Sequence, residues 1–112
     1  MTISLGIYMG VLYLRGRRSP RMVAAIHFLT GAGGFEAMFL LLRGAPDPAW
    51  GSLIGNGKLA GLMLAMALLS GIGMSLLTQA RPAALGPALL AHAVVGGGAF
   101  AMLLTWAVMV SF

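Results

Sequence analysis

Two stretches of the chain share a frame of small and aromatic residues behind a histidine: HFLTGAGGF at residues 27–35 and HAVVGGGAF at residues 92–100. Glycine recurs four and six residues after each histidine, and phenylalanine recurs eight residues after it. The chain has only two histidines and both lie in this frame, so their separation of 65 residues indicates an internal duplication. The duplication predicts two copies of a helical hairpin, each with one histidine.

Residues outside the two histidine stretches follow the same offset. Gly6 aligns with Gly71, and the neighbouring matches are Ile7, Met9 and Leu12 with Ile72, Met74 and Leu77. We therefore expect one integral membrane domain over residues 1–112, with hairpin repeats at about 1–47 and 59–112.

The composition excludes an ordinary soluble domain. Hydrophobic residues make up 60% of the chain and charged residues 8%, with a mean hydropathy of +0.97, whereas soluble domains have about 25% charged residues. The net charge of +5 does not indicate nucleic-acid binding, because the few basic residues lie at the ends of apolar segments. Because the chain has no cysteine, it cannot form a disulfide, a haem thioether, an iron–sulfur cluster or a thiolate metal site.

Four apolar segments lie at about residues 1–14, 22–42, 59–78 and 84–111, and the polar stretches between them are short except for the long loop over residues 43–58. The last three reach the roughly 20 residues that a helix needs to cross the hydrocarbon core. The first is shorter, and its repeat partner suggests that it is a truncated copy. The predicted fold is an all-α membrane protein, in which two tandem hairpins form a four-helix bundle with a pseudo-two-fold axis along the membrane normal.

Basic residues near the segment ends predict the orientation, because positive loops stay in the cytoplasm. Five arginines are expected at the surface that holds the short connections: Arg15, Arg17, Arg18, Arg21 and Arg81. Two basic residues are expected at the opposite surface, Arg43 and Lys58. This places the protein in the inner (cytoplasmic) membrane as a multi-pass protein with both termini outside.

His27 and His92 are predicted to lie at the same depth, near the cytoplasmic surface, since they follow Arg21 and Arg81 by six and eleven residues. A histidine in a membrane helix costs free energy unless it is paired or ligating. For one histidine an interhelical hydrogen bond would suffice, but two at one depth favour shared ligation of a cofactor. Gly31 and Gly96 follow one turn later on the same face and would leave room for a flat ring.

A b-type haem fits this prediction, because two neutral imidazoles fill both axial positions of its iron. Its propionates would need cations, for which Arg21 is the nearest candidate. A (bacterio)chlorophyll, which takes one histidine per ring, is an alternative. So is ligation by one histidine and a methionine, either Met9 or Met74.

The sequence favours a small cytochrome b-like electron-transfer subunit over a stand-alone enzyme, working between a quinone pool and a partner redox protein. Expected partners besides the bilayer are a larger membrane complex or a second copy, and no nucleic acid. Alternatives from another class are a non-redox accessory subunit and a small dimeric transporter. Glu36, the only acidic residue within an apolar segment, is predicted to lie away from the histidines and to pair with Arg43 or Lys58; a proton-relay or quinone-site role is the alternative.

Overall fold

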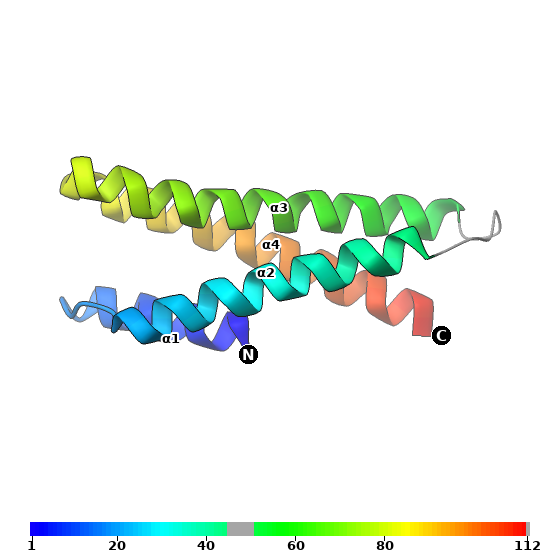
Figure 1. Ribbon diagram of the computed structural model, residues 1–112, viewed down its shortest axis with the longest axis horizontal. Helices are drawn as coiled ribbons and strands as arrows, with labels where there is room; N and C mark the ends of the chain where they lie inside the picture. The colour runs from blue at the N-terminus through cyan, green and yellow to red at the C-terminus, as the bar shows by residue number, and fades with distance from the viewer. Residues whose placement is uncertain (45–50, 112) are drawn as a thin grey trace.

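The computed structural model describes residues 1–44 and 51–111, and every regular element in these residues is helical (Figure 1). The order is α1 (Thr2–Leu14), α2 (Arg21–Arg43), α3 (Gly51–Ala80) and α4 (Leu85–Ser111), with a single 3-10 turn, η2 (Pro82–Ala84), leading into α4. These bounds agree closely with three of the four apolar segments. The helices form an elongated bundle with a long axis of 49 Å.

The connection between α1 and α2 is built from glycine and proline. Gly16 adopts a positive φ of 68°, and the backbone N–H groups of Gly16 and Arg17 donate to the carbonyls of Tyr13 and Leu12. This pair of bonds is a Schellman motif, which satisfies carbonyls left without partners at the end of α1. Pro20 then precedes the first residue of α2 with a φ of −59°, so the chain reverses within a few residues.

The start of α3 was predicted wrongly. The sequence predicts that residues 51–58 belong to the long loop before the third apolar segment, but the helix begins at Gly51. Tertiary packing overrides the weak local helix propensity of these residues. A Cβ atom placed on Gly57 would lie 2.7 Å from Leu42 Cδ2 and 2.8 Å from Trp106 Nε1, which shows how closely the first part of α3 packs on α2 and α4.

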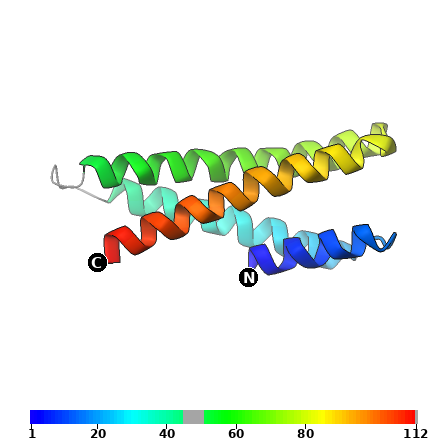
Figure 2. The same cartoon turned by 180° about the vertical axis from the view of Figure 1, so that it is seen from behind.

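Each helix packs on two neighbours around the bundle, α1 on α2 and α4, and α3 on α2 and α4. In Figure 1 α2 lies in front and α4 behind, and Figure 2 reverses the view. No Cα atom of α2 comes within 8 Å of one in α4 in the described parts of the chain, so these two helices are diagonally opposite. The buried side chains are mostly small, which lets the backbones approach closely: Met38, Ala60, Ala67 and Ala99.

The outer surface of the bundle is apolar. Large hydrophobic side chains are exposed along all four helices. Within the residues that the structure describes, three stretches are long and apolar enough to cross a membrane: Arg21–Arg43, Gly57–Ala80 and Pro82–Met109. Such a surface suits lipid and not water. We conclude that the protein is a helical membrane protein with three candidate spans.

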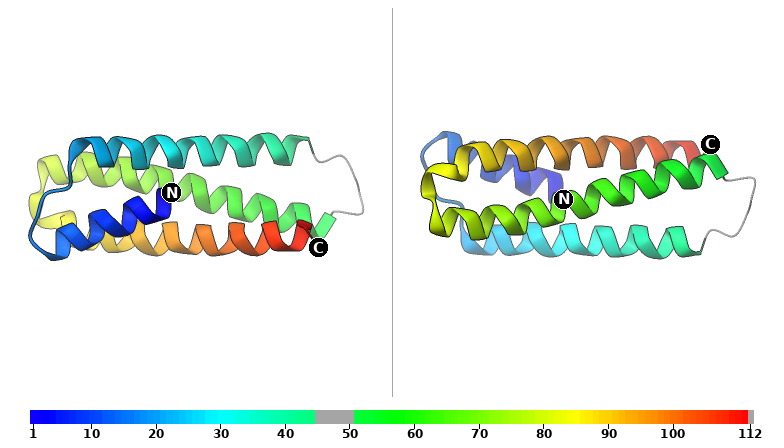
Figure 3. Two further views of the ribbon diagram at one scale, coloured as in Figure 1. Left: turned by 90° about the horizontal axis from the view of Figure 1, so that it is seen from below. Right: turned by 90° about the horizontal axis from the view of Figure 1, so that it is seen from above.

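Helix α1 occupies only part of the bundle's length. Its 13 residues are too few to span the hydrocarbon core. It begins near the middle of the bundle and runs to the end that holds both short connections (Figure 3). At that end, therefore, four helices surround the bundle axis.

We expect Gly57→Leu to destabilise the bundle by about 2 kcal/mol or more, because even the Cβ atom would come too close to the Trp106 ring and to Leu42, and the leucine needs further space beyond it. Thermal unfolding in detergent measures the change. Gly55→Leu is the matched control, since a Cβ atom at Gly55 meets nothing within 4 Å on the same helix. Equal melting temperatures for the two variants would contradict the close packing at Gly57.

Candidate functional site

His27 on α2 and His92 on α4 meet in the bundle. Their ring centroids are 6.1 Å apart and the ring planes are inclined by 76°. Both side chains are half-buried. Because α2 and α4 are diagonally opposite, the two imidazoles reach towards each other across the centre of the bundle. The structure thus brings together two residues that lie far apart in the sequence.

The hydrogen bond made by His27 defines its tautomer. Its Nδ1 atom lies 2.8 Å from the backbone carbonyl oxygen of Thr2, in the first turn of α1. A carbonyl oxygen can only accept a hydrogen bond, so Nδ1 carries the proton and donates. The lone pair of Nε2 is therefore left for another partner.

His92 is held through a serine hydroxyl. Its Nδ1 atom lies 2.8 Å from Ser70 Oγ on α3, and the same hydroxyl donates to the carbonyl of Ala67 at 2.8 Å. Since the hydroxyl has one hydrogen and uses it on the carbonyl, Ser70 Oγ accepts from the Nδ1–H of His92. His92 consequently has the same tautomer as His27.

A glycine of the preceding helix lies against each imidazole. A Cβ atom on Gly6 would be 3.1 Å from Cε1 of His27, and one on Gly71 would be 3.1 Å from Cε1 of His92. Contacts this short are tighter than nearly all real Cβ contacts. The absence of a side chain at both glycines is what lets each ring lie against the neighbouring backbone.

The supporting contacts follow the same 65-residue offset as the histidines. Gly6 and Gly71 are related by it, and so are Thr2 and Ala67. The Thr2 carbonyl accepts a hydrogen bond from His27, and the Ala67 carbonyl accepts one from the serine hydroxyl that holds His92. The difference is Ser70, which stands between His92 and the Ala67 carbonyl.

The two glycines expected to make room for a ring have different surroundings. A Cβ atom on Gly31 would lie 3.6 Å from Thr2 Cγ2, whereas one on Gly96 would meet nothing within 4 Å. Gly31 thus lies beside α1, and the face of α4 at Gly96 is open. Contact of either glycine with a cofactor stays a prediction.

Arg21 is the first residue of α2 and is exposed. It lies at the end of the bundle that holds both short connections (Figure 3). The other arginines of these connections are exposed as well, namely Arg15, Arg17, Arg18 and Arg81. In the described residues none of the five forms an ion pair.

Glu36 is exposed on α2 and makes no ion pair in the part of the chain that the structure describes. The predicted pairing with Arg43 or Lys58 is therefore wrong. The guanidinium carbon of Arg43 instead lies 5.1 Å from the centroid of the Phe39 ring, a cation–π distance. Arg43 and Phe39 are one helical turn apart, so this local contact needs no change in the backbone.

Within residues 1–44 and 51–111 no group of three or more histidine, cysteine, aspartate or glutamate side chains could hold a metal ion. The histidine pair offers two ligands only, so a metal bound there would need further ligands of its own, as a macrocycle supplies. The donor set suits a metal already held in a ring.

Sequence reasoning missed the residues that hold the imidazoles. The alignment of Gly6 with Gly71 was visible, but these glycines were assigned no role in the site. Nothing in the sequence singles out Ser70 or the Thr2 carbonyl, because a hydrogen bond between helices depends on how the helices pack.

Comparison of the chain with protein-family models, with curated proteins and with solved structures gave no match. The geometry of the histidine pair is therefore the basis for a functional assignment.

Proposed function

We propose that the protein is a small membrane cytochrome b-like subunit, in which His27 and His92 are the two axial ligands of one b-type haem. It would pass electrons between a quinone pool and a partner redox protein. The observation that carries this proposal is the separation of the two imidazoles.

The distance between the two imidazole rings agrees with the distance expected for two rings that ligate one haem iron. Two imidazoles on opposite sides of one metal, each bonded at about 2.0 Å, have ring centroids roughly 6 Å apart. The observed distance is 6.1 Å. Both rings donate through Nδ1 to a protein oxygen, which leaves Nε2, a common ligating atom, on each. The donor set and its spacing fit a bis-imidazole haem.

Partners of the Nδ1–H groups have a second role in such a site. A ligating histidine almost always donates its other N–H to a carbonyl, carboxylate or water, which orients the ring and raises its basicity. The Thr2 carbonyl does this for His27 and Ser70 for His92. The chain orients two rings in advance, so little conformational entropy is lost on binding.

A bound haem with both axial positions filled supplies one-electron transfer and has no open position for a substrate. This favours a carrier over a catalyst. Around the ring, Gly31 and Gly96 would leave space, and Arg21 would be the first of the exposed arginines to face the propionates.

The orientation and symmetry of the bundle belong to the same proposal. The arginine-bearing connections would face the cytoplasm, with both termini outside the inner membrane. The matched contacts at Gly6 and Gly71 support two tandem hairpins related by a pseudo-two-fold axis. A larger membrane complex or a second copy would be the partner.

The separation of the rings bears on the chlorophyll alternative. If the two Nε2 atoms face each other, two pigments with one histidine each would place two metals and two macrocycles between the imidazoles. A space of 6.1 Å between ring centroids accommodates one metal. The geometry therefore favours one shared haem.

An optical spectrum of the purified protein, oxidised and then reduced with dithionite, tests the proposal. We expect a sharp Soret band with resolved α and β bands on reduction. Red or near-infrared bands would show a chlorin instead. A protein that stays colourless after expression with haem and reconstitution would overturn the proposal in favour of a non-redox accessory subunit or transporter.

Ser70→Ala should weaken haem binding by about 10- to 100-fold without changing the ligands, because partners of ligating histidines have effects of this size. The Nδ1–H of His92 loses its acceptor, so the reduction potential should also shift. Haem titration and potentiometry measure both, and Ser70→Thr should restore them. Ser75→Ala, at an exposed serine of the same helix, is the control; equal affinities for the two alanine variants would contradict the role of Ser70.

Gly96→Leu should abolish haem binding while leaving the unliganded bundle intact, because the new side chain would occupy space that the proposed ring needs, whereas its Cβ atom meets nothing within 4 Å in the bundle. Gly97→Leu is the matched control, since Gly97 is exposed and its Cβ atom would also meet nothing within 4 Å. Haem content and circular dichroism are measured together. Full haem content in Gly96→Leu would show that the haem ring does not lie against Gly96.

A further inference from the structure

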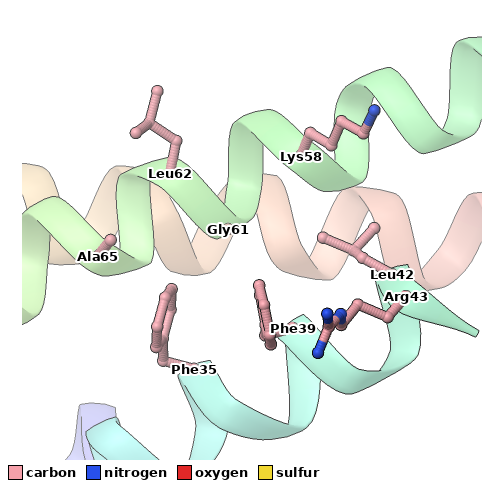
Figure 4. A pocket seen from close by; sticks show the side chains of 8 residues that line it. All are labelled: Phe35, Phe39, Leu42, Arg43, Lys58, Gly61, Leu62 and Ala65. Carbon is pink, nitrogen blue, oxygen red and sulfur yellow. The ribbon is translucent and has the colours of Figure 1, made fainter.

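An apolar groove lies between α2 and α3 (Figure 4). Its lining residues on α2 belong to the last turns of the helix, whereas His27 lies in its first turns. The volume of the groove is about 380 Å³. The rings of Phe35 and Phe39 rise from α2 towards Gly61 on α3, where no side chain stands in their way. The groove thus has aromatic and aliphatic walls along a length of two helical turns.

Two cations line one end of this groove, Arg43 from α2 and Lys58 from α3. Both side chains are exposed, and within the described residues neither forms an ion pair. No acidic residue lines the groove, and Glu36 is not among its lining residues. The positive charge at this end is therefore uncompensated by the described parts of the chain.

The cations lie at a defined level of the candidate spans. Arg43 is the last residue of one span, Arg21–Arg43, and Lys58 is the second residue of the next, Gly57–Ala80. Phe35 lies eight residues before Arg43, which is about 12 Å deeper along the helix. The charged end of the groove is thus at headgroup level, and its apolar end reaches into the hydrocarbon region.

We propose that this groove binds an anionic phospholipid, with the phosphate at the end that Arg43 and Lys58 line and an acyl chain along Phe35, Phe39 and Gly61. Charge selects this occupant over a zwitterionic lipid or a neutral quinone, because each basic residue near a surface attracts an anionic lipid by about 1 kcal/mol. The site is separate from the histidine pair, and the proposal does not depend on haem.

Native mass spectrometry of the purified, delipidated full chain tests the proposal. Dioleoyl phosphatidylglycerol and dioleoyl phosphatidylcholine have the same chains and compete for the protein in detergent. We expect the tightest-bound lipid to show a preference of roughly tenfold or more for phosphatidylglycerol, from the two cations at the groove. Equal binding of the two lipids would overturn the proposal, and so would displacement of phosphatidylglycerol by an equimolar ubiquinone.

Two sets of variants locate the site. The double variant Arg43→Gln with Lys58→Gln should lose the preference, whereas Arg17→Gln with Arg18→Gln at the opposite end should keep it. Gly61→Leu should lose bound lipid of either kind by filling the groove, and Gly73→Leu, on an open face of α3, should not. If the Arg17 and Arg18 variant lost the preference, or the Arg43 and Lys58 variant kept it, the proposed site would be wrong.

Discussion

Replacing His27 or His92 by alanine is expected to abolish low-spin haem, and this is the largest effect we predict. One imidazole would remain opposite water, which gives a weaker ligand field and a different spectrum. Loss of a ligand should reduce haem affinity by more than the 10- to 100-fold typical of residues behind a ligand. Both variants should behave alike, because each ring is held by one hydrogen bond and one glycine contact.

Reduced-minus-oxidised spectra and haem titration of His27→Ala and His92→Ala measure this effect. Glu36→Gln is the control, because Glu36 is exposed and makes no ion pair in the described part of the chain, and its spectrum should match that of the unaltered protein. A wild-type spectrum in both histidine variants would end the cytochrome proposal.

Gly71→Leu is expected to have the second largest effect, a loss of haem with the helices retained. A Cβ atom at Gly71 already approaches His92 Cε1 to 3.1 Å, so the rest of a leucine must take the place of the imidazole. The displaced ring loses its hydrogen bond to Ser70 and its position opposite His27. Overpacking of this kind costs about 1–3 kcal/mol.

Gly73→Leu, two residues along α3, is the matched control. A Cβ atom at Gly73 would meet nothing within 4 Å, so this variant should keep its haem and its melting temperature. Haem content per protein and circular dichroism are compared for both variants. Retention of haem in Gly71→Leu, with an unshifted spectrum, would mean that His92 does not need its present position.

Some features of the protein follow from local sequence alone. Apolar segments bounded by glycine, proline and arginine predict helices at nearly the observed positions for α1, α2 and α4, because hydrophobic length and turn chemistry act over a few residues. The same spacing of glycine and phenylalanine after His27 and after His92 also identified both histidines as candidate ligands from local sequence. Their meeting could be inferred from equal depth, but the distance between them could not.

Only the tertiary structure decided how the histidine pair is built. The partners of Nδ1, the Thr2 carbonyl and Ser70, lie on helices packed beside each histidine. Likewise, α3 begins at Gly51, ahead of the apolar segment, and Gly57 in this part of the helix packs closely on Leu42 and Trp106. Such contacts depend on how helices rotate and approach each other, and a pattern along one chain carries little information about either.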